Sequence, residues 1–93
     1  MMQHVVLTLR NKVGLHARPA SVLVQTCARF KSNITVENAT KKSPAVNAKS
    51  ILGVLTLGAE RGHEIVLTAD GPDELDAIAV LCGLVDEGFG DPE

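Results

Sequence analysis

The chain contains no tryptophan or tyrosine and only two phenylalanines among its 93 residues. A core without aromatic rings has to be built from valine, leucine, isoleucine and alanine, and hydrophobic residues make up 45% of the chain. The scarcity of aromatics, the lack of a basic run and the formal net charge of −2 leave little with which to stack bases or neutralise phosphates. The composition therefore argues against a nucleic-acid reader.

Cysteines and long apolar runs are also scarce. Cys27 and Cys82 lie far apart, each in a predicted helix, and we expect buried free thiols rather than a disulfide. No apolar run is long enough to span a bilayer, and residues 1–4 (MMQH) lack the basic start of a secretory signal. We therefore expect a single small cytoplasmic domain over residues 1–93, without membrane insertion.

Residue periodicity predicts the elements of this domain. Alternating polar and apolar residues predict strands over residues 2–9, 34–37, about 45–47 and 63–69. Helical spacing predicts helices that cover residues from just before 20 to about 31, 50–58 and about 73–87. In the last helix we expect Leu75, Ile78, Cys82 and Val85 to face the core. The order predicts an α+β fold, an open-faced β-sandwich in which an antiparallel four-stranded sheet carries three helices on one face.

Residues 14–20 (GLHARPA) place a glycine, a histidine and a proline directly before an apolar-periodic run. The proline fits the first turn of a helix, where a missing N–H has no cost. His16 then lies at or next to the N-cap, with its imidazole beside the free amides of Ala17, Arg18 and Ala20. The helix dipole and the Arg18 guanidinium would stabilise an anion carried on that ring. A histidine in this setting can accept a phosphoryl group reversibly, although His16 taken alone could also be an ordinary loop or capping residue.

Two stretches together resemble one family. Residues 14–25 are similar to the active-site signature of HPr, the phosphohistidine carrier of the bacterial phosphoenolpyruvate-dependent sugar phosphotransferase system. Residues 47–58 (NAKSILGVLTLG) resemble the regulatory serine segment of the same family. The resemblance covers nearly the whole chain. The loop over residues 38–46 is a few residues longer than in typical members, and we interpret it as a tolerated insertion.

The resemblance implies a relay role. His16 would take a phosphoryl group on Nδ1 from phosphorylated enzyme I and pass it to enzyme IIA domains of sugar permeases. The Arg18 guanidinium and the backbone of Ala17 and Arg18 would contact the phosphate. We expect no metal or cofactor, no stand-alone enzyme activity, and a monomer, since a shuttle has to meet several proteins in turn.

The resemblance also implies regulation. Ser50 would be the target of an ATP-dependent HPr serine kinase/phosphorylase, with a catabolite-repression transcription regulator as a further partner. Ile51 and Leu52 match the exposed apolar pair that docks partners, with Lys49 beside them. The residues alone leave simpler explanations open, because Ser50 is a good N-cap and the apolar pair could belong to the core.

Other functions remain in competition with sugar transport. The same fold could serve a nitrogen-branch phosphorelay or act as a catabolite-repression regulatory protein. A stand-alone histidine-dependent phosphatase or transferase is disfavoured, because the chain offers no second catalytic acid, glycine-rich phosphate loop or metal-ligand pattern. His4 and His63 are expected to be surface residues.

Overall fold

The structure is a computed structural model that describes residues 2–90. Its elements in chain order are β1 (Gln3–Thr8), α1 (Ala17–Cys27), β2 (Asn33–Asn38), β3 (Val46–Asn47), α2 (Ile51–Leu55), β4 (Glu64–Asp70), α3 (Glu74–Asp86) and a short 3₁₀ turn, η1 (Gly88–Gly90). The strands form one sheet in the order β1-β4-β2-β3, and each neighbouring pair is antiparallel. The predicted order of elements and the α+β class are confirmed.

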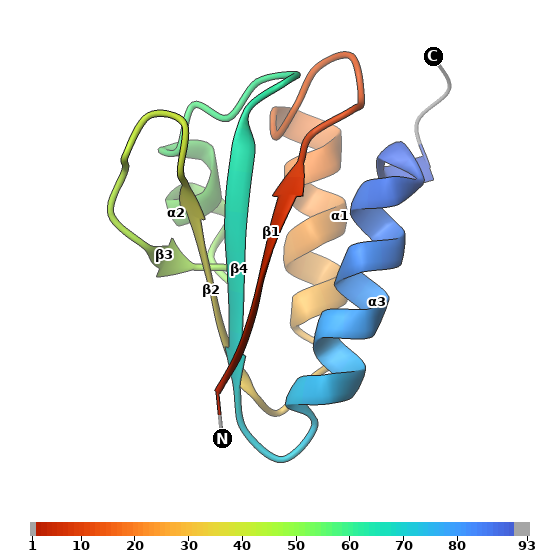
Figure 1. Cartoon of the computed structure of the whole chain (residues 1–93). Coiled ribbons are helices and arrows are strands. Elements are labelled where there is room, and N and C mark those ends of the chain that lie inside the picture. The colour runs from red at the N-terminus through yellow and green to blue at the C-terminus, as the bar shows by residue number, and fades with distance from the viewer. Residues whose placement is uncertain (1, 91–93) are drawn as a thin grey trace.

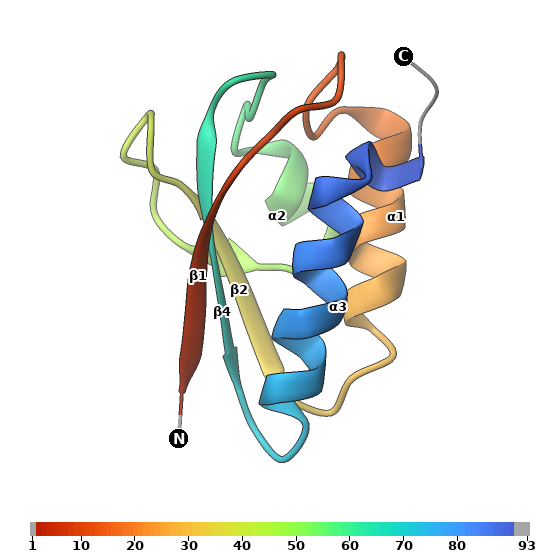
Figure 2. The ribbon, with the colours of Figure 1, turned by 45° about the vertical axis from the view of Figure 1, so that its right-hand side comes forward.

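All three α-helices cover the same face of the sheet. Figure 2 shows the sheet nearly edge-on, with α1, α2 and α3 on one side of it. The loop that precedes α1, the loop that precedes β4 and the end of α3 lie at the same end of the molecule (Figure 1). The open-faced sandwich is therefore confirmed, and this end brings together segments that are far apart in the chain.

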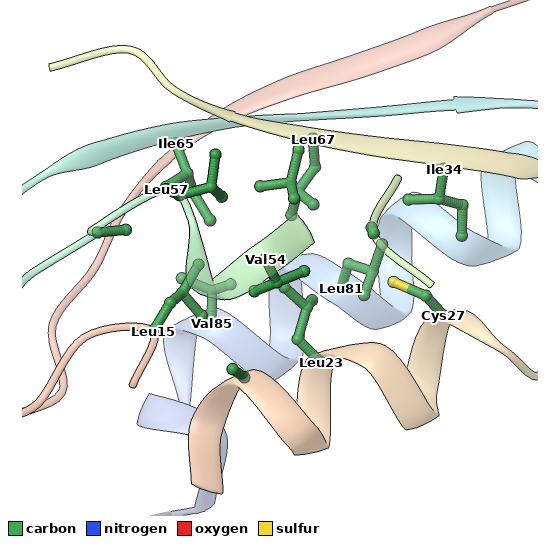
Figure 3. Close-up of a cluster of buried hydrophobic side chains, with 14 of the residues drawn as sticks. Leu15, Leu23, Cys27, Ile34, Val54, Leu57, Ile65, Leu67, Leu81 and Val85 are labelled. Atoms are coloured by element: carbon green, nitrogen blue, oxygen red, sulfur yellow. The ribbon is translucent and has the colours of Figure 1, made fainter. Parts of the chain in front are cut away.

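Aliphatic side chains form the core between the sheet and the helices. Residues on β2 and β4 alternate between buried and more exposed positions, as the sequence pattern predicts. Their register pairs Val36 with Leu67, and both side chains are fully buried. Figure 3 shows Leu23 from α1 and Val54 from α2 meeting residues of the sheet in one layer. The short edge strand β3 follows Pro44, in keeping with the absence of a proline N–H for a sheet ladder.

The first helix begins earlier and ends earlier than predicted. The Ala20 N–H donates to the His16 carbonyl at 3.3 Å, so α1 begins at Ala17. It ends at Cys27 instead of about Lys31, because the next residues make tighter i→i−3 bonds, such as Arg29 N–H to the Thr26 carbonyl at 3.2 Å.

A contact from the start of α3 also draws the chain away from α1. The Asp73 carboxylate accepts the N–H of Lys31 and the N–H and hydroxyl of Ser32, at 2.9, 2.9 and 2.5 Å. These bonds, the Ser32 hydroxyl first among them, lower the pKa of Asp73 to about 2. Asp73 therefore joins the start of α3 to the turn between α1 and β2.

The core-facing side of α3 differs from the prediction, since Val85 is buried as expected but Ile78 and Cys82 are only half-buried. Ala77, Leu81 and Val85 are buried, whereas the Leu75 side chain is 68% exposed, so the expectation that Leu75 faces the core is wrong. Glu74 takes the buried position in the first turn, where its Oε1 accepts the Gly71 N–H at 3.1 Å. This bond fixes the rotation of a helix that is apolar on most sides.

The second helix is shorter than predicted. It ends at Leu55 with Thr56 as its C-cap, three residues before the expected stop at Gly58. The chain continues in a tighter turn, in which the Leu57 N–H donates to the Val54 carbonyl at 3.2 Å. Gly58 then adopts φ 55° and ends this turn.

The two cysteines are free thiols that differ in burial. Cys27 is fully buried, while Cys82 is half-buried rather than buried as expected. Burial raises the pKa of the Cys27 thiol to about 12, and the nearby Lys49 ammonium partly opposes this rise. A protonated thiol is a poor nucleophile, so Cys27 acts as a small packing residue.

Candidate functional site

His16 is the N-cap residue of α1, as the sequence predicts. Its backbone is extended, with φ −91° and ψ 161°, and its carbonyl accepts the first helical hydrogen bond. Its side chain is exposed and makes no capping bond, and within residues 2–90 the ring has no hydrogen-bond partner. Solvent and a partner protein can therefore reach the imidazole.

The amides at the start of α1 agree only partly with the prediction. The N–H of Ala20 is committed to the His16 carbonyl, so the expectation that Ala20 contributes a free amide is wrong. Ala17 has φ 23°, a conformation that residues with a Cβ rarely adopt. Ala17 and Arg18 are both exposed at the positive end of the helix dipole. Both residues are therefore accessible next to His16.

Three contacts anchor the segment that leads into His16. Gly14 has φ 61°, and a Cβ there would lie 2.4 Å from the Ala59 carbonyl oxygen, so a glycine is required. The Leu15 N–H donates to that same carbonyl at 2.9 Å, and the Leu15 side chain is buried. The Asn11 Nδ2 donates to the Gly14 carbonyl at 2.8 Å. His16 is thus exposed while the residues directly before it are fixed against the core.

An open depression beside His16 brings in residues that sequence reasoning missed. Lys12, Val13, Glu60 and Arg61 line it together with His16. Two of these side chains are cationic and one is a carboxylate, so the surroundings of His16 are more highly charged than the motif alone suggests. Because β1 pairs with β4, the loop that follows β1 lies beside the loop that precedes β4. Alternation predicted both strands but did not specify that they pair.

His63 is a structural acceptor and not simply a surface residue, so the prediction for it is wrong. It is half-buried, its Nδ1 accepts the Glu60 N–H at 3.1 Å, and that nitrogen lies 3.2 Å from the Asn38 Nδ2. Asn38 is fully buried and also donates to the Leu57 carbonyl at 3.2 Å. Because a backbone N–H can only donate, Nδ1 of His63 is an unprotonated acceptor. These bonds fix the loop that carries Ala59 and Glu60.

Ser50 is the N-cap of α2, which confirms the predicted cap. Its Oγ accepts the Gly53 N–H at 3.2 Å. Beside it, Lys49 is half-buried and its Nζ donates to the Phe30 carbonyl at 2.7 Å, beyond the C-terminal end of α1. His16 lies at the opposite end of α1, and Ser50 does not line the depression around it. The two candidate phosphorylation sites are therefore separate.

The second helix exposes an apolar surface. The side chains of Ile51, Leu52 and Leu55, which we call the α2 patch, are 39%, 76% and 43% exposed. Val54 faces the core instead and is fully buried. Because α1 packs against α2, the patch adjoins the helix that carries His16. The exposure that a docking role requires is present.

The described residues, 2–90, hold neither a metal-binding cluster nor a membrane-spanning helix. They contain no group of three or more histidine, cysteine, aspartate or glutamate side chains that could hold a metal ion. Within the same residues no helix has the length and apolar character to cross a membrane. His4 is exposed, as expected.

Comparisons with known proteins point to one family. A family model described as "PTS HPr component phosphorylation site" matches residues 4–87. The phosphocarrier protein HPr of Xylella fastidiosa is 44% identical over 91 residues, which are 98% of each chain. The crystal structure of HPr-C-His from Thermoanaerobacter tengcongensis is 44% identical, with a TM-score of 0.90 over 98% of this chain and 99% of that one.

A longer relative shows the same similarity over part of its length. The multiphosphoryl transfer protein of Haemophilus influenzae is 40% identical over 84 residues. These residues are 90% of the chain described above but only 17% of that protein. The match therefore concerns one segment of the larger protein.

Proposed function

This chain belongs to the HPr family of the phosphotransferase system, and from that premise we propose that it carries a phosphoryl group on His16. The group arrives from phosphorylated enzyme I, ultimately from phosphoenolpyruvate, and leaves to enzyme IIA domains of sugar permeases. The observation that carries the proposal is an exposed imidazole at a helix N-cap whose ring makes no hydrogen bond within residues 2–90.

The chemistry is a displacement between two histidines. The lone pair of the His16 Nδ1 attacks the phosphorus of the enzyme I phosphohistidine, and the P–N bond to enzyme I breaks as the new P–N bond forms. Histidine is suited to this role because its neutral, nucleophilic form is present at neutral pH. The protein contributes mainly placement, since in-line transfer needs little other covalent chemistry.

Charges around His16 favour the phosphoryl dianion. Ala17 and Arg18 are the first residues of α1, at its positive end, and the Arg18 guanidinium would contact the phosphate. Lys12 and Arg61 extend this cationic surface along the depression. Together such contacts are worth about 1–3 kcal/mol, enough to position the group without trapping it.

Partner docking is proposed for the α2 patch. Ile51 and Leu52 would pack against apolar surfaces of enzyme I and of IIA domains, with Lys49 at the edge of the contact. Exposed leucine and isoleucine side chains in one cluster are typical of a protein interaction site. The monomeric state and the cytoplasmic location remain predictions.

Regulation at Ser50 is proposed through charge. Phosphorylation by an HPr serine kinase/phosphorylase would leave a dianion at the N-terminus of α2, where the helix dipole tolerates it. The fold would persist, but the charge beside Ile51 and Leu52 would weaken docking to acidic surfaces of enzyme I. The same phosphate would give a catabolite-repression regulator a new surface to bind.

The test is incubation with phosphoenolpyruvate and enzyme I. We expect one acid-labile, base-stable phosphoryl adduct, which is absent from His16→Ala and present in Ser50→Ala. Onward transfer to a sugar-specific IIA domain, and not to a nitrogen-specific one, distinguishes the sugar branch from the alternative nitrogen branch. Labelling that persists in His16→Ala would contradict the proposal.

A further inference from the structure

Asn11 is a buried amide directly beneath the segment that carries His16. Its side chain is only 1% exposed, although asparagine is usually found at protein surfaces. The Nδ2 donates to the Gly14 carbonyl at 2.8 Å, and the Asn11 backbone carbonyl accepts the Gly14 N–H at 3.3 Å. Asn11 therefore holds Gly14 through both of its backbone polar groups, two residues before His16.

The other half of this amide does not contribute a hydrogen bond. Within the described part of the chain, the Asn11 Oδ1 is buried and accepts none. Its orientation follows from chemistry, because the Gly14 carbonyl can only accept and must face Nδ2. An unpaired buried oxygen lowers stability, so burying this amide has a cost that the donor to Gly14 has to offset. The donor to Gly14 is the property that only the amide supplies.

Neighbouring segments restrict the movement of Asn11. A Cβ built on Gly88 would lie 3.5 Å from the Asn11 Cβ, so the turn after α3 covers this residue closely. Phe89, in the same turn, is buried with φ 60°. The end of α3 and the loop before α1 indeed lie together in both ribbon views (Figures 1 and 2). A shift of Asn11 would therefore require movement of the C-terminal turn.

We propose that Asn11 is a positioning residue for phosphoryl transfer. Through the Gly14 carbonyl it fixes the direction in which the His16 ring leaves the surface, without touching the phosphoryl group. The inference rests on the proposed function of His16. Placement matters here because a misplacement of about 1 Å can lower the rate of a transfer reaction about 100-fold.

The first test separates positioning from docking. Single-turnover and steady-state transfer from phosphorylated enzyme I are measured for Asn11→Ala and for the isosteric Asn11→Asp. At about pH 8 we expect the kcat for transfer from enzyme I to each variant to fall about tenfold or more. The KM for the variant should be nearly unchanged, because the α2 patch proposed to dock enzyme I is intact. Leu52→Ala is the matched control, in which KM should rise while kcat stays close to that of the unmodified protein.

The second test uses pH to restore the hydrogen bond. In Asn11→Asp a protonated carboxyl can again donate to the Gly14 carbonyl, whereas an ionised one places oxygen against oxygen. Burial favours the protonated form, so transfer by this variant, relative to the unmodified protein, should recover as the pH falls from about 8.5 to about 5.5. The deficit of Asn11→Ala, which lacks any donor, should not change over the same range.

Thermal unfolding of each variant corrects the rates for the folded fraction. The positioning role would be overturned if both variants transferred at the rate of the unmodified protein, or if unfolded protein accounted for the whole deficit. Neither result would affect the labelling of His16 in the unmodified protein. A deficit without recovery of Asn11→Asp at low pH would also overturn it. Absence of His16 labelling in the unmodified protein would defeat the proposed function, and the inference with it.

Discussion

Two helix N-termini of this molecule are capped in opposite ways. At α2 the N-cap Ser50 accepts the Gly53 N–H, and the cap is satisfied. At α1 the N-cap His16 makes no side-chain capping bond, its ring is exposed, and Ala17 next to it adopts φ 23°. One terminus thus uses its cap side chain for stability, whereas the other leaves it available to a partner.

Under the roles proposed for His16 and Ser50, this difference would separate chemistry from regulation. A side chain that already caps a helix can gain a phosphate with little change of shape, because the added charge still faces the helix N-terminus. A side chain that caps nothing can be modified and restored without unfolding a turn. We therefore expect stability and activity to respond oppositely to changes at these two positions.

The largest effect is expected from His16→Ala. Phosphoryl acceptance should be lost entirely, while the free energy of unfolding should change by no more than about 0.5 kcal/mol, since no capping bond is removed. Urea unfolding followed by circular dichroism measures the second quantity. A loss of more than about 1 kcal/mol would show that the ring has a structural role and would break the comparison.

A large structural effect is expected from Gly14→Ala. The added Cβ would overlap the Ala59 carbonyl at a φ that favours glycine, and we expect a loss of about 2–4 kcal/mol in the free energy of unfolding. Gly83→Ala is the matched control, because Gly83 lies within α3 and a Cβ there meets nothing within 4 Å. That control should gain about 0.5–1 kcal/mol. Equal changes in the free energy of unfolding of the two variants would show that Gly14 does not anchor the His16 segment.

A moderate effect is expected at the satisfied cap. Ser50→Ala should lower the free energy of unfolding by about 1 kcal/mol, whereas Ser50→Asp should retain most of the stability because aspartate also caps. Ser50→Asp should nevertheless slow transfer from enzyme I, and Ser50→Ala should not. Chemical denaturation measures the stability of each variant, and transfer rates measure its reaction with enzyme I. Slowing by the alanine variant alone would contradict the charge mechanism.

The smallest effect is expected at the third N-cap, Asp73. Its folded pKa of about 2 lies below the ordinary 3.8, so its charge stabilises the fold above that ordinary value, and the stabilisation is lost as pH falls. Asp73→Asn should lower the melting temperature at neutral pH. The difference from the unmodified protein should shrink between pH 3.8 and 2 and be gone below it. A difference in melting temperature that does not change with pH would show that the hydrogen bonds from Ser32 do not require an ionised Asp73.

Much of the fold could be predicted from local patterns. Alternation predicted the strands, and Ser50 could be recognised as a cap from its place before an apolar run. The errors arose where a single side-chain hydrogen bond, which residue periodicity does not report, sets the end or the rotation of a helix. Asp73 binds the N–H of Lys31 and draws the chain out of α1, and the bond from Gly71 to Glu74 sets the rotation of α3.

The candidate site was predictable in its chemistry but not in its surroundings. The motif identified His16 and placed it at the N-cap, because glycine and proline report on local backbone geometry. Asn11 was missed because a polar residue in a turn-rich loop gives no sign in the sequence that it is buried. Glu60 was missed because its place beside His16 follows from pairing of β1 with β4. Such pairing is a long-range property that residue periodicity does not specify.

The central claim is that the uncapped histidine accepts the phosphoryl group. It is tested most directly by nitrogen NMR of histidine-labelled protein after reaction with phosphoenolpyruvate and enzyme I. We predict phosphorus coupling at Nδ1 of His16, with the rings of His4 and His63 unchanged. Coupling at another histidine or at Nε2, or a phosphate found on Ser50 alone, would contradict the account.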